Sequence, residues 1–401
     1  MSNSRVVISG GGIGGLSAAL SLAQQGFNVQ VLEQAEEFAD VGAGIQLSPN
    51  ATRVLDDIGV LDAVRARSFQ PEGGEMRVWK SGEVLTFSQL GDLVERRFGS
   101  PYLNAHRADL VQCLADAAQQ HPAITLQTGA RVSGFEQHAG EVSVVVEQEH
   151  RETSVTCDVL IGADGIHSVV QAGLFGHSKP RFTGNVAWRA LVPAAALPQG
   201  VVAPRTTAWW GPGKHFVHYY VRDAELLNCV CVVEKSGWQI ESWTEPGDYN
   251  ELRSEFAGWH DSLQVVLEHV EPSSLYKWAL FDRQPLPVWS KGHVTLLGDA
   301  CHPTLPFMAQ GAAMAIEDGA VLARCLRAGL DEGGSIPEAL QRYERLRMER
   351  TAAVQLGSRS NARIFHLSGL PAYFRNLYVK YGNPKNPWLE LFQYDALTAH
   401  L

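Results

Sequence analysis

The sequence lacks the features that mark membrane, exported and nucleic-acid-binding proteins. No apolar run reaches the roughly 18 residues that a membrane-spanning helix requires. No Ala-x-Ala cleavage site follows the Gly-rich segment near the N-terminus, so we expect no export and a cytoplasmic location. The formal net charge is -10 and no block of Lys and Arg offsets it, which argues against a nucleic-acid partner. Small-molecule chemistry remains as the expectation.

Cysteine is scarce and poorly placed for metal binding or redox chemistry. The six cysteines are scattered, and Cys229 and Cys231 lie together on one predicted strand. Because no second Cys or His pair stands at ligand spacing, we predict core cysteines and no metal site. The chain also has no Cys-x4-Cys pair and a single glycine fingerprint, which weakens the case for a disulfide reductase with two dinucleotide folds.

The length of the chain and the pattern of its side chains predict two lobes and a helical tail. At 401 residues the chain is too long for one simple domain. Residues from about 182 to 281 alternate aromatic and β-branched side chains, as antiparallel sheets do. We predict an α/β fold with a Rossmann-like dinucleotide-binding domain, an inserted antiparallel β-sheet substrate domain and a C-terminal helical segment. The predicted boundaries are 1–181 and 286–335 for the first domain, 182–285 for the inserted domain, and 336–401 for the tail.

A glycine-rich turn lies between the first predicted strand and the first predicted helix. Gly10, Gly12 and Gly15 give the pattern G-x-G-x-x-G, with Gly14 inside it. The first glycine makes the turn, the second admits a pyrophosphate, and the third lets the helix approach the sheet. Glu33 closes the second predicted strand, where a carboxylate can hold ribose hydroxyls. Together these features predict dinucleotide binding rather than an incidental glycine turn.

A second strand-to-helix junction lies late in the chain. An apolar strand stops at Gly298-Asp299, and after two prolines a helix opens with Gly311 and Ala312. Such small residues leave room for a flat group against the helix N-terminus, where free N–H groups and the helix dipole favour negative charge. The alternative, a tight turn kept small for packing, explains the glycine but not the carboxylate.

Five ordered motifs, covering about residues 5 to 350, give the chain a family resemblance. The chain resembles the single-component FAD-dependent aromatic hydroxylases of the p-hydroxybenzoate hydroxylase fold, and within them it is most similar to salicylate hydroxylase and 3-hydroxybenzoate 6-hydroxylase. The motifs are the glycine turn with Glu33, Val41-Gly-Ala-Gly-Ile-Gln-Leu-Ser-Pro-Asn50, His106-Arg-Ala-Asp-Leu110, Gly162-Ala-Asp-Gly165, and Gly298-Asp299 with the loop from Pro303 to Gly311. One departure is Gln171, where the family usually has an arginine.

The resemblance implies an FAD-dependent monooxygenase that hydroxylates a small phenolic acid of the hydroxybenzoate or salicylate type. The enzyme would use O2, with NADH or NADPH as a transient co-substrate, and would act through a flavin C4a-hydroperoxide. The resemblance also implies that Asp299 accepts a hydrogen bond from the flavin ribitol and that Gly311 and Ala312 lie against the flavin ring. Arg107 would contact the FAD phosphates or ribose, and Gln46 would lie in a loop near the flavin.

One predicted strand of the inserted domain carries two histidines that could act as the base. Period-two alternation puts His215 and Tyr219 on one face and His218 and Tyr220 on the other. A phenolate attacks better than a phenol, so a base should help to remove the phenolic proton. The resemblance favours His218 as that base over His215, with Tyr220 and Pro306 near the substrate. The alternative is that His218 is a half-buried histidine satisfied by structural contacts.

Other functions stay open on the sequence alone. An FAD monooxygenase acting as an epoxidase or N-hydroxylase on a non-phenolic substrate would share every cofactor motif. A non-enzymatic flavin-binding sensor would bind FAD without substrate-stimulated NAD(P)H oxidation, and a plain NAD dehydrogenase would carry no yellow chromophore. The oligomeric state is also open, and a homodimer is one candidate.

Overall fold

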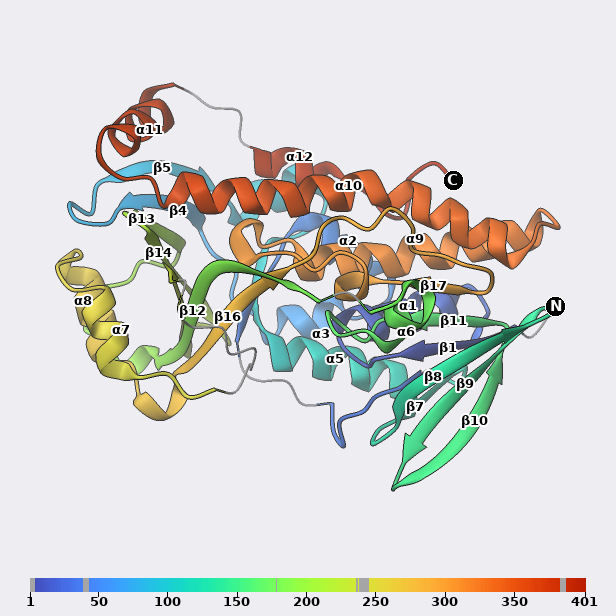
Figure 1. Cartoon of the computed structure of the whole chain (residues 1–401). Helices are drawn as coiled ribbons and strands as arrows, with labels where there is room; N and C mark the ends of the chain where they lie inside the picture. Colours follow the sequence, from blue (N-terminus) through green and yellow to red (C-terminus); the bar gives the residue numbers. More distant parts are fainter. Residues whose placement is uncertain (1–3, 39–42, 178, 236, 238–244, 383–386) are drawn as a thin grey trace.

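The computed structural model describes residues 4–38, 43–177, 179–235, 237, 245–382 and 387–401. It confirms the predicted α/β class, with a Rossmann-like parallel sheet, a large mostly antiparallel sheet and C-terminal helices (Figure 1). Val41 and Gly42, at the start of the motif that carries the predicted loop near the flavin, lie outside the described residues. No described helix combines the length and apolar character needed to cross a bilayer.

The nucleotide-binding part is built on a five-stranded parallel sheet in the order β17-β11-β1-β2-β7. Its strands are β1 (Arg5–Ser9), β2 (Asn28–Leu32), β7 (Ile124–Gln127), β11 (Val159–Gly162) and β17 (Val294–Leu296). The strands are short and apolar, as expected where both faces of a parallel sheet are covered. Because β17 pairs with β11, the two segments predicted to bind nucleotide form one sheet.

Helices bring the two glycine-rich segments together. α1 (Ile13–Gln24) packs so closely on α9 (Gly311–Asp331) that a Cβ on Gly319 would meet the Cα of Ala18 at 2.8 Å. This part also contains α2 (Pro49–Asp57), α3 (Leu61–Arg65), α4 (Gly91–Phe98), α5 (Arg107–Gln120) and α6 (Val169–Phe175). Its two smaller sheets are formed by β3 (Gly44–Leu47) with β6 (Leu103–His106), and by β8 (Arg131–His138), β9 (Glu141–Gln148) and β10 (Arg151–Cys157).

The large sheet has seven strands in the order β16-β12-β15-β14-β13-β4-β5. They are β4 (Gly73–Val78), β5 (Val84–Gln89), β12 (Arg181–Pro193), β13 (Thr206–Gly211), β14 (Lys214–Val221), β15 (Leu226–Glu234) and β16 (Tyr276–Asp282). The assignment of 1–181 wholly to the nucleotide-binding domain is wrong for β4 and β5. These strands extend the large sheet because β4 pairs in parallel with β13. The boundaries at 182, 286 and 336 stay predictions.

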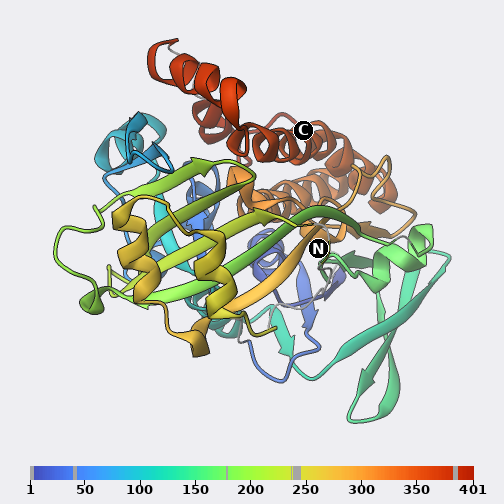
Figure 2. The ribbon, with the colours of Figure 1, turned by 60° about the vertical axis from the view of Figure 1, so that its left-hand side comes forward.

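The large sheet buries apolar side chains on both faces and therefore separates two cores. On one face, Trp188 and Phe216 pack against α7 (Tyr249–Glu255) and α8 (Asp261–Glu268), which lie across the sheet in Figure 2. On the other face, Trp210 and Val232 belong to a core that includes Phe307 and Phe365. Phe365 ends α10 (Ile336–Phe365), which is followed by α11 (Gly369–Tyr381) and α12 (Pro387–Gln393).

A fully buried group of charges joins α9 to α10. Arg347 of α10 contacts Glu317 at 2.6 Å and Asp318 at 2.7 Å, both on α9, and all three side chains are inaccessible to solvent. Burial raises the pKa of Asp318, but the charges of His302 and Arg347 outweigh it and hold the pKa at about 2. Buried charges are tolerated only when paired, so this group specifies one relative position of the two helices.

We predict that Arg347→Met lowers the free energy of unfolding at pH 7 by roughly 3–5 kcal/mol, because Asp318 is left buried without a guanidinium partner and Glu317 keeps only Arg350. The contribution of ionised Asp318 to the free energy of unfolding is fully present above the unfolded-state pKa of about 3.9. It is lost as the pH falls toward the folded-state pKa of Asp318. The variant should therefore lose less additional stability than the wild type between pH 4 and pH 2. Chemical denaturation across pH measures both effects. Arg345→Met, at an exposed position on α10, is the control, and equal stability of the two variants would contradict the prediction.

Candidate active site

A cavity of about 1050 Å³ lies between the nucleotide-binding part, the large sheet and the C-terminal helices. The glycine turn and the start of α9 form one end of its lining, and β13, β14 and β12 contribute the other. Eight of the predicted site residues line it: Gly12, Gly14, Gln46, Arg107, Asp299, Pro306, Gly311 and Ala312. Gly10, Gly15 and Glu33 instead shape the turn behind the lining.

The glycine turn has the shape that a dinucleotide pyrophosphate requires. Gly10 has a φ of +103°, and a Cβ on Gly15 would stand 2.0 Å from the Gly10 carbonyl oxygen, so neither position tolerates a side chain. By contrast, a Cβ on Gly12 would meet no protein atom within 4 Å. The space beside Gly12 is therefore open, at the point where the pattern expects a phosphate.

Glu33 holds the glycine turn in place. Its Oε2 accepts a hydrogen bond from the Gly11 backbone N–H at 2.6 Å, and its Oε1 accepts from the Ala35 N–H at 2.8 Å. Each carboxylate oxygen keeps a second lone pair that a ribose hydroxyl could use. The position of Glu33 at the end of β2 is the one predicted for a ribose-binding acid.

Asp299 and Arg107 place one charge of each sign in the cofactor end of the cavity. Asp299 is accessible from the cavity although protein surrounds it, and this burial raises its pKa, against the nearby charges of His302 and Arg107. Among the described residues no side chain hydrogen-bonds to Asp299. A carboxylate in this setting suits the hydroxyl groups of a sugar or ribitol chain.

The start of α9 offers a flat backbone surface to the cavity. The helix begins at Gly311, and a Cβ added there would meet nothing within 4 Å. Its N-cap residue, Gln310, is buried and donates to Ser48 Oγ at 3.0 Å rather than capping the helix with its side chain. The first N–H groups of α9 therefore face the cavity with no side-chain cap, where the helix dipole favours a negative charge.

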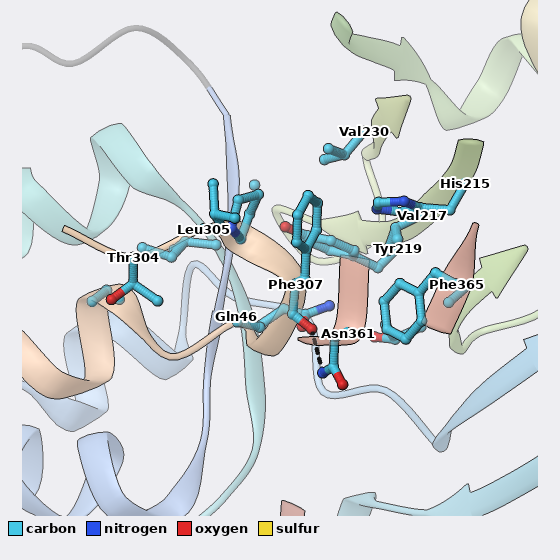
Figure 3. Close-up of a pocket in the computed structure, with 18 of the residues that line it drawn as sticks. Gln46, His215, Val217, Tyr219, Val230, Thr304, Leu305, Phe307, Asn361 and Phe365 are labelled. Atoms are coloured by element: carbon cyan, nitrogen blue, oxygen red, sulfur yellow. Dashed lines mark hydrogen bonds between the residues drawn. The ribbon is translucent and has the colours of Figure 1, made fainter. Parts of the chain in front are cut away.

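The sheet end of the cavity carries the groups that a substrate would meet (Figure 3). His215, Val217 and Tyr219 of β14 project into it from one face of the strand. Phe307 and Phe365 contact the His215 ring edge-on, with centroids 5.0 and 5.4 Å away. Of these five side chains, three are apolar and two, His215 and Tyr219, are polar.

The prediction that His218 faces the flavin is wrong. His218 and Phe216 lie on the opposite face of β14, where His218 Nε2 accepts a hydrogen bond from Trp209 Nε1 at 3.0 Å. Burial lowers the pKa of His218 to about 4. Tyr220, predicted near the substrate, also lies outside the cavity lining, with its hydroxyl donating to the Val202 carbonyl at 3.3 Å. His218 is a core histidine, buried among described residues that bond its Nε2 but leave its Nδ1 without a partner.

Close packing at Gly44 joins the cofactor side to the sheet. A Cβ there would stand 2.5 Å from the Asn228 side chain and 2.7 Å from Tyr219, and the Gly44 N–H donates to Asn228 Oδ1 at 2.7 Å. This contact brings β3, with Gln46, against β14 and β15. Sequence reasoning missed Tyr219 and Arg189 as cavity residues, although the period of the strand already separated Tyr219 from Tyr220.

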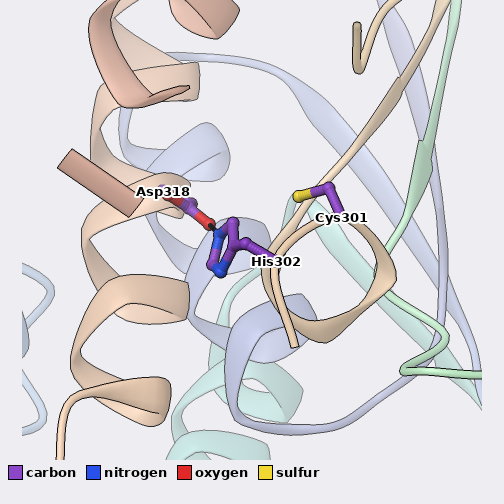
Figure 4. A group of neighbouring side chains, drawn as sticks. All are labelled: Cys301, His302 and Asp318. Atoms are coloured by element: carbon purple, nitrogen blue, oxygen red, sulfur yellow. Dashed lines mark hydrogen bonds and ion pairs between the residues drawn. The ribbon is translucent and has the colours of Figure 1, made fainter. Parts of the chain in front are cut away.

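Cys301, His302 and Asp318 form a buried cluster beside the cavity (Figure 4). His302 Nε2 lies 2.5 Å from Asp318 Oδ2, which also accepts from the Gly298 N–H at 3.1 Å. Because Arg347 binds the other oxygen of Asp318, the carboxylate is already engaged on both oxygens. The cluster therefore supports the turn that carries Asp299. All six cysteines are buried, as predicted for core residues, and none forms a disulfide.

Fold and cavity together define a dinucleotide-binding protein with an attached substrate chamber. The family described as FAD binding domain matches residues 3–357, and the chain belongs to this family. A 3-hydroxybenzoate 6-hydroxylase of Klebsiella oxytoca is 38% identical over 377 residues, covering 94% of this chain and 92% of the relative. A 6-hydroxynicotinate 3-monooxygenase of Pseudomonas fluorescens is 38% identical over 360 residues, covering 89% and 91%. A solved salicylate hydroxylase substrate complex has a TM-score of 0.82 at 25% identity and covers 98% of this chain and 96% of that one.

These relatives confirm the predicted resemblance and the predicted class. The protein is an FAD-dependent monooxygenase of the aromatic hydroxylase type. The residues fit the cofactor, because the open space at Gly12 and Gly311 and the cavity-facing Asp299 lie where pyrophosphate, ring and ribitol would be held.

We predict that Gly12→Val abolishes FAD binding, because its side chain would fill space that is free of protein atoms and needed by the pyrophosphate. The purified variant should be colourless and should fail to bind added FAD in a fluorescence titration. Gly134→Val is the matched control, since a Cβ there also meets nothing within 4 Å but lies on β8, away from the cavity. A yellow Gly12→Val protein would show that FAD binds elsewhere.

Proposed function

We propose that the protein hydroxylates a small phenolic acid of the hydroxybenzoate or salicylate type, with His215 as the base. The observation that carries this proposal is the cavity-facing imidazole of His215, in the same chamber as Asp299 and the start of α9. FAD, once reduced by NADH or NADPH, supplies the activation of O2. The use of O2, the cytoplasmic location and a homodimer stay predictions.

The environment of His215 suits a base that works in its neutral form. Burial, and then the neighbouring His366, hold the pKa of His215 well below its ordinary value, so the ring carries no charge at pH 7. Its Nδ1 lies 2.7 Å from His366 Nε2, which leaves Nε2 for a ligand in the cavity. A phenol with a pKa near 10 costs roughly 4 kcal/mol to deprotonate at neutral pH, and a positioned imidazole offsets part of this.

Arg189 is the candidate partner for the substrate carboxylate. Among the described residues of the large sheet that line the cavity, it is the one cation. Arg189 pairs with Val230 across β12 and β15, and Val230 pairs with Val217 of β14. Two strand spacings put Arg189 about 10 Å from the backbone of β14. His215 lies two residues from Val217 on the same face of β14, so Arg189 and His215 line the same cavity from strands two apart in the sheet.

Apolar side chains should keep water away from the reacting ring. Val217, Val230, Leu305 and Phe307 line the same region of the cavity (Figure 3). Asn361 Nδ2 of α10 donates to the Phe307 carbonyl at 3.1 Å and so fixes the loop that carries Phe307. A dry site lengthens the life of reactive species and strengthens the interaction of Arg189 with a carboxylate.

A hydroxybenzoate should accelerate NADH or NADPH oxidation and leave with one oxygen atom from isotopically labelled O2, as measured by mass spectrometry. The corresponding carboxamide should lose this acceleration, because it cannot form an ion pair with Arg189. Arg189→Met should raise the KM for the acid by about 10-fold to 100-fold and change the response to the carboxamide much less. If every phenol released only hydrogen peroxide, an epoxidase or N-hydroxylase acting on a non-phenolic substrate would be the better assignment.

His215→Asn should lower the hydroxylation rate by roughly 10²–10⁴, while flavin reduction by NADH suffers less. His218→Gln is the matched control, since it sits on the same strand, faces the other core and keeps an acceptor for Trp209. Single-turnover product formation, measured on FAD-loaded proteins, compares the hydroxylation rates of the two variants. A loss that follows His218 instead of His215 would mean that the cavity face of β14 does not host the chemistry.

A further inference from the structure

A line of three side chains leads from the cavity to the protein surface. His215 Nδ1 lies 2.7 Å from His366 Nε2, and His366 Nδ1 lies 2.8 Å from Glu234 Oε1. The His366 side chain is 2% exposed, whereas that of Glu234 is 56% exposed. The first group thus lines the cavity, the second is buried and the third reaches solvent.

The contacts around His366 hold it between its two partners. It follows the last residue of α10, and its carbonyl accepts from the N–H of Gly213 at 3.0 Å, at the turn between β13 and β14. The same turn receives the backbone of Glu234, whose N–H donates to the Gly213 carbonyl at 2.9 Å. One tight turn therefore positions both His366 and Glu234 relative to the strand that carries His215.

We propose that His215, His366 and Glu234 form a proton relay that carries the phenolic proton from the cavity to solvent. The proposal rests on the proposed function, in which His215 accepts that proton. In it, His366 is a positioning and transfer residue that never touches the substrate. It belongs to the C-terminal segment, beyond residues 3–357 that the family match covers.

The protons balance in three linked transfers. The phenol O–H gives its proton to His215 Nε2, and His215 passes the proton on its Nδ1 to His366 Nε2. His366 then passes the proton on its Nδ1 to the Glu234 carboxylate, which exchanges it with water. Each imidazole ends neutral, the positive charge of the proton reaches solvent, and the phenolate keeps its negative charge in the cavity.

The relay solves a difficulty of the buried base. Burial disfavours a charged imidazole at His215, so a proton that stopped there would be costly to hold. The charged groups around His366 are Glu234 of β15, which raises its pKa, and Arg375 of α11, which lowers it, while burial lowers it most. A neutral His366 can accept a proton from His215 on one ring nitrogen and release the proton on its other nitrogen to the exposed carboxylate of Glu234.

The test compares His366→Gln and Glu234→Gln with wild type. Each variant keeps a hydrogen-bonding side chain but interrupts transfer. Both should slow single-turnover hydroxylation of a hydroxybenzoate at pH 7 by about 10²-fold and regain rate as pH approaches the phenol pKa near 10. Reduction of bound FAD by NADH should stay within a factor of about two. Glu225→Gln, exposed at the opposite end of the same hairpin, should behave as wild type.

A second substrate distinguishes transfer from simple structural support. A hydroxybenzoate with a nitro group ortho or para to its hydroxyl is largely ionised at pH 7, so both variants should hydroxylate it at nearly the rate of the wild-type enzyme. Equal losses with both substrates, or an unchanged pH profile, would overturn the relay. If wild type hydroxylates no phenol, the proposed function fails; if His215→Asn is impaired while His366→Gln and Glu234→Gln match wild type, only the relay fails.

Discussion

The buried pairing of Arg347 with Glu317 and Asp318 is the constraint on which the cavity depends. Asp318 also binds His302 and the Gly298 N–H, and Glu317 accepts from Asn50 Nδ2 at 2.6 Å. The loop that carries Asp299, the start of α9 and helix α2 are therefore tied to one arginine of α10. Removing Arg347 would leave Asp318 buried without a guanidinium partner, so these elements hold their positions together.

The two faces of the large sheet have different surroundings, and only one of them lines the cavity. One face packs on α7 and α8, and the other lines the cavity. His215 and His218 of β14 are three residues apart and point to opposite sides of the sheet. His215 therefore lines the cavity, and His218 packs in the other core. The alternation was predicted correctly, but apolar residues occupy both faces. No pattern in the strand itself could therefore show which face meets the cofactor.

Local features were predictable from the sequence and distant pairings were not. The glycine turn, Glu33 and the junction at Asp299 depend on short stretches whose conformation is decided by glycine and by strand ends. The addition of β4 and β5 to the large sheet depends on pairing with β13, about 130 residues later. The burial of Arg347 likewise depends on a contact between two helices, with two acids of α9. Such contacts come from tertiary packing, which single-chain periodicity does not contain.

Helix α10 connects the two halves of the site. Its middle holds the cofactor loop through Arg347, and its C-terminus presents Asn361 to the Phe307 loop, with His366 following to contact His215. A helix of 30 residues transmits position between these points, since its buried Arg347 fixes it against two acids of α9. The C-terminal helices thus help to form the cavity: the nucleotide-binding part lines its cofactor end, and α10 contacts both that end and His215.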